Sequence, residues 1–365
     1  MNDSLFPDLD SDRTIRKAVT PSKSQTPTRR SIIGPRQAEK HEARRLPEPE
    51  FTYQAMGAGV QSTTIALLAA EGRIEKPKFA VFSDTGWESK AVYDHLDRLD
   101  REVLQPSGVT LVKVGKSNLG NDAGSRHAPD LIPLYIRNPK TGKNGITRRQ
   151  CTSVYKIMPL GRWVREQLGA TVRSLPCTFC DGTGERTPPW LTDETGTCWP
   201  CGGTGRRRVV GQIPDKRQWA RGYIGFSVDE LGRAGASRDS YVVNSYPLLD
   251  LRMSRDDCND YLADKGWGDT LKSACIGCPF HSNAEWRKVK ADPVQWRSAV
   301  AADERVRNMP GRIGVGYLHE SRVPLVEADF STGGDRELGS CSPYGCRTGD
   351  TNFDNQLSLL LDDSP

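Results

Sequence analysis

FTYQAMGAGVQSTTIALLAAEGRIEKPKFAVFSD, residues 51–84, is the stretch that decides the fold. Within it, FTYQAM predicts a short strand, GAGVQS a glycine-rich turn, STTIALLAAEG a helix and KFAVFSD a second, buried strand. Gly72 ends the predicted helix, because glycine accepts the backbone angles found just after a helix. A strand, a helix and a strand in this order predict two parallel strands joined by a right-handed crossover.

The chain beyond this stretch continues the alternation of helices and strands. Apolar residues recur at helical spacing through residues 89–105, VTLVKVG (109–115) predicts a third strand, and residues 116–150 predict a mobile loop. Further helices are predicted at 154–169, at 254–266 and, as a pair separated by Asp292-Pro293, within 283–308, and further strands at 223–227 and 241–248. The expected fold is an α/β core built on a parallel sheet.

Composition divides the chain into five segments. Residues 1–50 are rich in Ser, Thr, Pro, Lys and Arg, which predicts a disordered basic arm, either a solvated tail or a nucleic-acid-binding segment. The other segments are a first part of the core (51–174), a four-cysteine insertion (175–208), a second part of the core with a CxxCP motif (209–330) and an irregular tail (331–365).

Charge and cysteine usage narrow the class of protein. The net charge of +5 is compatible with anionic substrates or nucleic acid and proves neither. No apolar run approaches the about 18 residues that cross a bilayer, and the first residues lack the apolar stretch of a signal peptide, so no membrane partner is expected. Six of the ten cysteines form CxxC pairs, which favours metal-bound thiolates in a reducing, cytoplasmic compartment over disulfides.

Two repeats, CTFCDGTG (177–184) and CWPCGGTG (198–205), carry the most specific local signal. Their four thiols predict a closed, tetrahedral Zn²⁺ site, formed by Cys177, Cys180, Cys198 and Cys201. The glycines suit the sharp turns that direct backbone N–H groups at sulfur. Because cysteine fills every position, the zinc is not expected to be catalytic. It either folds the insertion or makes it a docking site for RNA, DNA or a protein.

The turn after the first strand is a candidate phosphate site. Backbone amides at a helix N-terminus bind anions, and the candidate residues are Gly57, Gly59, Gln61, Ser62 and Thr63. The turn lacks the lysine of a Walker A loop and the full GxGxxG spacing. Asp84 and Glu88 follow the second strand, where parallel sheets bind nucleotides, and could hold Mg²⁺ or ribose hydroxyls or act as loop and capping carboxylates.

An ordered set of motifs now resembles a known family. GAGVQST, FSDTGWES, RRQCTSVYK, GFSVDELGR and SACIGCPFHS look like the PP-loop superfamily, the ATP-pyrophosphatase and phosphoadenosine phosphosulfate (PAPS) reductase-like fold, also called adenine nucleotide alpha-hydrolase-like. The likeness is greatest to a phage and bacterial branch labelled PAPS reductase family. It covers residues 51–330 without the four-cysteine insertion, which itself resembles half of a DnaJ-type zinc-binding module.

The chain departs from the family pattern in two places. The family loop is commonly SGGxDS, and here Gly57, Ala58 and Gln61 replace Ser, Gly and Asp, while Gly59 and Ser62 match. Loss of the aspartate removes its carboxylate but not the backbone amides. The Glu-Cys-Gly-x-His motif of PAPS reductases is also missing, since the nearest stretch, GCRTG, has neither Glu nor His. This counts against a thioredoxin-dependent reductase.

The resemblance assigns a second cysteine set to the chemistry. It implies that Cys151, Cys275 and Cys278 hold a [4Fe–4S] cluster, and the fourth ligand would be Cys341, Cys346 or Cys258. A second zinc site and a redox dithiol are the alternatives, and Cys258 also fits a buried structural thiol. Arg148 and Arg149, beside Cys151, are candidate phosphate ligands, because the arginine fork matches phosphate geometry.

The function that the resemblance implies is sulfur transfer dependent on ATP or a related adenylyl nucleotide. The nucleotide would activate an acceptor oxygen as an adenylate, and sulfur carried on the cluster or a thiolate would displace AMP. The acceptor could be a nucleic acid, tRNA or DNA, and a sulfur-donor protein is a further expected partner. The alternatives are reduction of PAPS to sulfite and a non-catalytic nucleotide- or nucleic-acid-binding protein, which the altered loop would favour.

Overall fold

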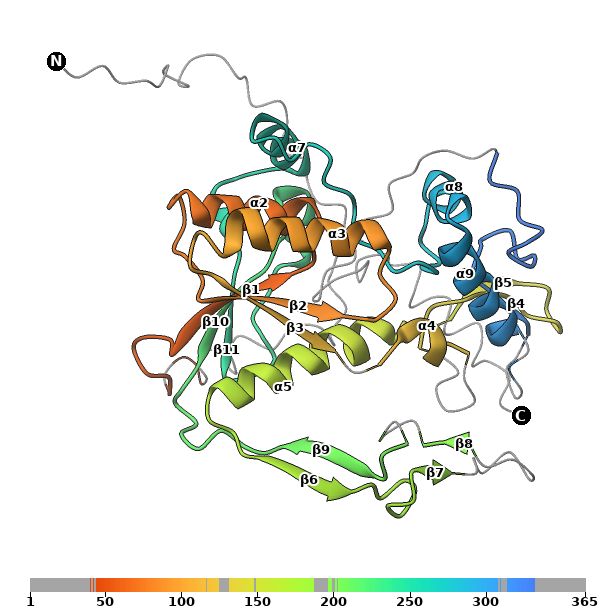
Figure 1. The fold of residues 1–365 in the computed structure, drawn as a ribbon, viewed down its shortest axis with the longest axis horizontal. Helices are drawn as coiled ribbons and strands as arrows, with labels where there is room; N and C mark the ends of the chain where they lie inside the picture. Colours follow the sequence, from red (N-terminus) through yellow and green to blue (C-terminus); the bar gives the residue numbers. More distant parts are fainter. Residues whose placement is uncertain are drawn as a thin grey trace.

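A sheet of five parallel strands forms the centre of the protein (Figure 1). Its order is β11 (Val242–Ser245), β10 (Ala220–Tyr223), β1 (Phe51–Met56), β2 (Phe79–Asp84) and β3 (Thr110–Gly115). The structure is a computed structural model that describes residues 40, 42, 44–115, 117–124, 131–147, 149–186, 196–198, 201, 203–307, 309 and 314–331. The α/β core on a parallel sheet that the sequence predicts is thereby confirmed.

Helices cover both faces of this sheet (Figure 1). On one face lie α2 (Val60–Ala70), α3 (Lys90–Leu99) with its π-helical continuation η1 (Asp100–Leu104), and α7 (Arg255–Asp264), and on the other lies α5 (Met158–Gln167). Strand β1 divides its side chains between these two cores, since Met56 packs toward α2 and Tyr53 packs toward α5. Strand β1 is buried on both faces, and the adjoining strand β2 begins with the apolar run that such burial favours.

The strand order reverses at β1, and we call the region outside the carboxyl ends of β1, β2 and β10 the crevice. The chain adds β2 and β3 on one side of β1 and later returns to add β10 and β11 on the other side. Strands β1 and β10 are parallel neighbours, with Tyr53 opposite Gly222. In open α/β sheets, ligands bind outside the carboxyl ends of the strands at the point where the order reverses. That point lies where β1 meets β10.

A smaller substructure packs beside the carboxyl edge of the sheet. A three-stranded antiparallel sheet has the order β12 (Gly316–Tyr317), β4 (Tyr135–Arg137) and β5 (Asn144–Ile146). Helices α4 (Leu119–Asp122), α8 (Asn283–Ala291) and α9 (Pro293–Arg307) complete it around a core that contains Trp286. The predicted loop over 116–150 therefore also holds short elements, and three residues are too few to show an alternating pattern.

The four-cysteine insertion begins and ends as a two-stranded ribbon. Strand β6 (Val172–Pro176) pairs with β9 (Arg206–Val210), and β7 (Glu185–Arg186) pairs with β8 (Gly196–Thr197) near the tip (Figure 1). Arg208 of β9 forms an ion pair with Glu166 of α5, which ties the ribbon to the core. The remaining short elements are η2 (Thr152–Ile157), η3 (Val228–Arg233) and α6 (Pro247–Asp250).

Local sequence signals account for two helix starts. Ser254 caps α7, because its hydroxyl accepts the Asp257 N–H (3.1 Å) and the Asp257 carboxylate accepts the Ser254 N–H (2.8 Å). Helix α9 begins at Pro293, a position that proline favours. Arg148, Cys341, Cys346 and residues 1–39 lie outside the described residues. Within the described part of the chain, none of the helices is long and apolar enough to cross a membrane.

Candidate functional site

The glycine-rich turn lies at the carboxyl end of β1, directly before α2. Gly59 precedes the helix, and its N–H donates to Ser62 Oγ (3.0 Å), while that hydroxyl donates to the Gly59 carbonyl (3.0 Å). Ala58, where the family pattern has glycine, adopts a φ of 54° in the left-handed region. The turn thus keeps the backbone shape that glycine would favour at this position.

Three backbone amides at this turn are placed to meet an anion. Those of Val60, Gln61 and Ser62 precede the first intrahelical hydrogen bond, which runs from the Thr63 N–H to the Gly59 carbonyl (2.9 Å). The Thr63 hydroxyl lies 2.9 Å from His95 Nε2. Thr63 therefore uses both its polar groups inside the protein, and the amides before it carry the anion-binding capacity.

The carboxyl end of β10 closes on the start of α2. A Cβ atom on Gly225 would lie 3.3 Å from the Ser62 nitrogen, so a larger residue would press against the first turn of α2. Gln61 Nε2 donates to Glu230 Oε2 (3.2 Å), and Glu230 also pairs with Arg233. The Arg233 guanidinium lies 4.5 Å from the centre of the Phe226 ring. The side chain that replaces the family aspartate is thus tied to the β10 side of the crevice.

A buried polar cluster follows β2 on the other side of the crevice. Glu88 Oε1 accepts a hydrogen bond from Thr85 Oγ1 (3.1 Å) and lies 3.5 Å from Lys156 Nζ, and the two charged side chains are 0% and 6% exposed. Cys275 Sγ lies 3.6 Å from the same carboxylate oxygen and 3.5 Å from Thr85 Oγ1. Glu88 Oε2 is buried and has no hydrogen-bond partner among the residues that the structure describes. A buried carboxylate, ammonium and thiol in contact form a group that can move or hold a proton.

Asp84 differs from Glu88 in its surroundings. It is partly exposed, and its Oδ1 accepts the Gly86 N–H (2.7 Å) and the Tyr93 hydroxyl (2.7 Å). Burial, followed by the hydrogen bond to Asp84, raises the pKa of Tyr93, so Tyr93 stays a donor at neutral pH. Of the two predicted acids, Asp84 is the one that can meet a ligand from solvent.

The Cys275–Cys278 loop is held against the end of β2. Trp87 O accepts the Ile276 N–H (2.8 Å), and Glu88 and Cys275 form a β-bridge. The Trp87 indole leaves no room for a side chain at Gly277, where a Cβ atom would overlap its ring. His281 Nε2 lies 2.9 Å from the Cys275 carbonyl, so this nitrogen carries the proton.

The second cysteine set is brought partly together. Cys151 and Cys275 pack into the same hydrophobic cluster, and Cys151 begins the π-helical turn η2 that carries Lys156. The Arg149 guanidinium lies 5.7 Å from the centre of the Phe280 ring, which follows the CxxCP motif. Cys258, on α7, is fully buried in the cluster that contains the α2 side chains, which is a different cluster from that of Cys151 and Cys275.

The four sulfurs of the insertion form a metal site. Cys177, Cys180, Cys198 and Cys201 have ligand atoms within 4.8 Å of one another, and they are the only such group among the described residues. The Sγ–Sγ distances are 3.8 Å for Cys177–Cys198 and 3.7 Å for Cys180–Cys201. A tetrahedron with Zn–S bonds of about 2.3 Å has sulfurs about 3.8 Å apart. The group can therefore bind a metal such as zinc.

The two repeats fold as near-identical halves. The first cysteine of each donates its N–H to the last glycine of the other, Cys177 to Gly205 (2.8 Å) and Cys198 to Gly184 (2.7 Å). Both glycines have positive φ, and a Cβ atom on either would overlap a backbone carbonyl of the facing repeat. This explains why each repeat ends in glycine.

Hydrogen bonds to sulfur favour ionised thiols in this site. Burial raises the pKa of the Cys180 thiol, but the Gly184 N–H directed at its sulfur (3.3 Å) and the neighbouring thiols hold that pKa at about 7. Burial and the same neighbours raise the pKa of Cys198 to about 12, as expected when close thiols lose protons in turn. A bound cation would complete the ionisation, since metal ligation requires thiolates.

Sequence reasoning missed two members of the site by the crevice. Thr85 and Gly225 were not singled out, although Thr85 lies in the quoted motif FSDTGWES and Gly225 begins the quoted motif GFSVDELGR. No protein-family model matches this chain, and no curated protein is similar to it. The fold and the geometry of the site are therefore the grounds on which function is argued.

Proposed function

We propose that this protein is an adenine-nucleotide-dependent enzyme of sulfur transfer, with a PP-loop-like active site at the carboxyl ends of β1, β2 and β10. The observation that carries the proposal is the juxtaposition, at one sheet edge, of a glycine-rich turn at a helix start and a buried thiol. The amides of Val60, Gln61 and Ser62 start a helix there, and Cys275 lies beside Glu88 and Lys156 across the crevice.

The residues fit distinct roles in this reaction. The turn from Gly57 to Ser62 would bind the phosphates, and Asp84 would hold Mg²⁺ or a ribose hydroxyl, because it is the accessible acid. Nucleotide and acceptor oxygen would combine to an adenylate with release of pyrophosphate, and a sulfur nucleophile would then displace AMP. Glu88, paired with Lys156, would position Cys275.

In this proposal, one set of cysteines has a structural role and the other takes part in the reaction. Zinc would hold the tip of the ribbon, because four cysteines fill its coordination. Cys151, Cys275 and Cys278 are the proposed ligands of a [4Fe–4S] cluster, which would supply a site for sulfide.

The test is incubation of the anaerobically purified protein with radiolabelled ATP, Mg²⁺, sulfide and nucleic acid. We expect AMP and pyrophosphate to form in equal amounts. The acceptor should gain sulfur from sulfide and keep no label from ATP. A Cys275→Ser variant should lose sulfur incorporation, whereas Cys258→Ser, a buried thiol outside the site, serves as the matched control. Sulfite formed from PAPS and thioredoxin at enzyme-like rates would instead identify a reductase, and ATP binding with neither product would identify a binding protein.

A further inference from the structure

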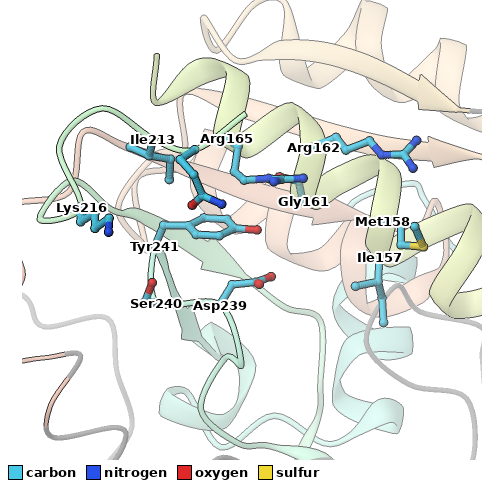
Figure 2. A pocket seen from close by; sticks show the side chains of 11 residues that line it. Ile157, Met158, Gly161, Arg162, Arg165, Ile213, Lys216, Asp239, Ser240 and Tyr241 are labelled. Carbon is cyan, nitrogen blue, oxygen red and sulfur yellow. The ribbon is translucent and has the colours of Figure 1, made fainter. Parts of the chain in front are cut away.

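A groove runs along helix α5 (Figure 2). This helix lies on the face of the sheet opposite to α2 and α3 (Figure 1). Its cavity volume is about 610 Å³. One wall is the stripe of α5 that carries Gly161, Arg162 and Arg165, and the other is formed by the segments that lead into β10 and β11. These segments lie at the amino ends of the strands, so most of the groove is separate from the crevice described above.

The groove carries an excess of positive charge. Arg162, Arg165 and Lys216 line it, and no carboxylate of a described residue lies within ion-pair distance of these three side chains. Burial, followed by the charges of Arg165, Arg207 and Arg208, lowers the pKa of Arg162. With Asp239 as the one carboxylate among the lining residues, these three cations leave the groove with a net positive charge, which suits a polyanion.

Positive charge is also present on the ribbon of the four-cysteine insertion. Arg208 is neutralised by Glu166, but the Arg207 guanidinium lies over the Phe179 ring, 5.2 Å from its centre. Phe179 is 45% exposed and Leu175, the cross-strand partner of Arg207, is 44% exposed. An arginine between exposed apolar side chains provides both charge and a flat stacking surface.

Two side chains in the groove suit a nucleobase better than a simple anion. Tyr241 projects its ring into the cavity, near Asp239 (Figure 2). Both side chains reach α5, since a Cβ atom on Gly161 would be in ordinary van der Waals contact with the Tyr241 hydroxyl (3.5 Å) and Asp239 Oδ2 (3.9 Å). A carboxylate repels an anionic ligand but accepts hydrogen bonds from the amino group of a base.

We propose that this groove, with the outer face of the ribbon, binds a single-stranded nucleic acid. Arg162, Arg165 and Lys216 contact phosphates, a base stacks on Tyr241, and Asp239 accepts from its amino group. An acidic peptide would meet the same cations but would gain nothing from Tyr241 and would be repelled by Asp239. A duplex keeps its bases stacked inside and cannot place one in the groove.

The groove also points to the acceptor in the proposed reaction, and that part of the inference rests on the proposed function. Ile157, at one end of the groove, follows Lys156, whose ammonium reaches Glu88 beside Cys275. Arg165, near the other end, lies 3.4 Å from the Val210 carbonyl at the base of the ribbon. Helix α5 spans about 12 Å between these residues, at about 1.5 Å per residue. A single-stranded nucleic acid that contacts the ribbon and follows the groove would therefore end near the candidate site.

The test is fluorescence anisotropy of fluorescein-labelled single strands of RNA and DNA, each 15 nucleotides long, with the full chain. No ATP or other free nucleotide is added. We expect Arg162→Ala/Arg165→Ala to weaken binding at least tenfold and to reduce the slope of log K against log salt by about 1.4, at about 0.7 per phosphate lost. Tyr241→Leu should weaken binding about tenfold, as loss of one stacked base does. Lys216→Ala, in an exposed segment, keeps the test informative if the α5 variant does not fold.

The matched control is Lys90→Ala/Arg101→Ala, which removes the same charge from exposed side chains on the opposite face. It should bind within twofold of the wild-type protein. Equal affinities for the groove and control variants, or displacement of the strand by polyglutamate at equal charge, would overturn the proposal. Because no ATP is present, a failure of nucleic-acid binding in this test leaves the proposed reaction standing. Conversely, strand binding that depends on Arg162 and Arg165 in a protein that binds no ATP would refute the reaction alone.

Discussion

Replacing Lys156 by methionine tests the buried pair that positions Cys275. The ammonium and the Glu88 carboxylate are 3.5 Å apart and nearly inaccessible. At an effective dielectric constant of about 20, their attraction is about 5 kcal/mol. Lys156→Met removes this attraction and leaves a buried carboxylate alone, which costs about 3–5 kcal/mol of the free energy of unfolding. Glu88→Gln keeps the acceptor for Thr85 but removes the charge.

Urea unfolding of the two single variants and the double variant measures this coupling. We expect Lys156→Met/Glu88→Gln to lose clearly less stability than the two single losses combined, because no charge is then left unpaired. Lys90→Met is the matched control, since Lys90 pairs with Asp94 at the surface and is 74% exposed. That pair should contribute less than about 1 kcal/mol. A Lys156→Met loss as small as that of the control, or additive losses in the cycle, would refute the buried pair.

Three further predictions concern the turns and the metals. Gly184→Ala should abolish zinc retention, measured by metal analysis after gel filtration, while Gly72→Ala, also at positive φ but with open space around it, should retain zinc. Ala58→Val should lower the free energy of unfolding by about 1–3 kcal/mol, because a β-branched residue is strained in the left-handed region; an unchanged urea midpoint would contradict the φ of 54°. Anaerobic purification should give about one zinc and four irons per chain, and two zincs without iron would contradict the cluster.

Strands β1 and β2 could be predicted from the sequence because each contains apolar residues with turn residues around it. The strand expected at 223–227 was wrong, because β10 spans Ala220–Tyr223 and its sequence, ARGY, is not an apolar run. The strands from Phe51 to Met56 and from Phe79 to Asp84 were expected within one residue of their bounds. The order of the strands could not be derived, since nothing in the sequence of β10 says that it pairs with β1 rather than with β3. The short strands beside α9 were also missed, because two or three residues show no period.

The site was predictable only where spacing alone specifies geometry. The spacing within the two CxxCxGxG repeats determines the turns that present the cysteines. The four sulfurs were therefore expected to lie together, and they do. The contact of Glu88 with Lys156 joins residues far apart in the chain and depends on how η2 packs against β2. The groove along α5 could not be predicted from the sequence either. Its arginines look like ordinary surface charges of a helix unless the segments before β10 and β11 that face them are known.

The central claim is that an adenine nucleotide binds where β1, β2 and β10 end. Photolabelling of the wild-type protein with 8-azido-ATP and Mg²⁺, followed by mass spectrometry of the labelled peptides, tests it most directly. The account predicts attachment within residues 57–64, 83–89 or 224–233 that excess ATP abolishes. Attachment confined to the groove along α5, or no labelling that ATP prevents, would contradict it.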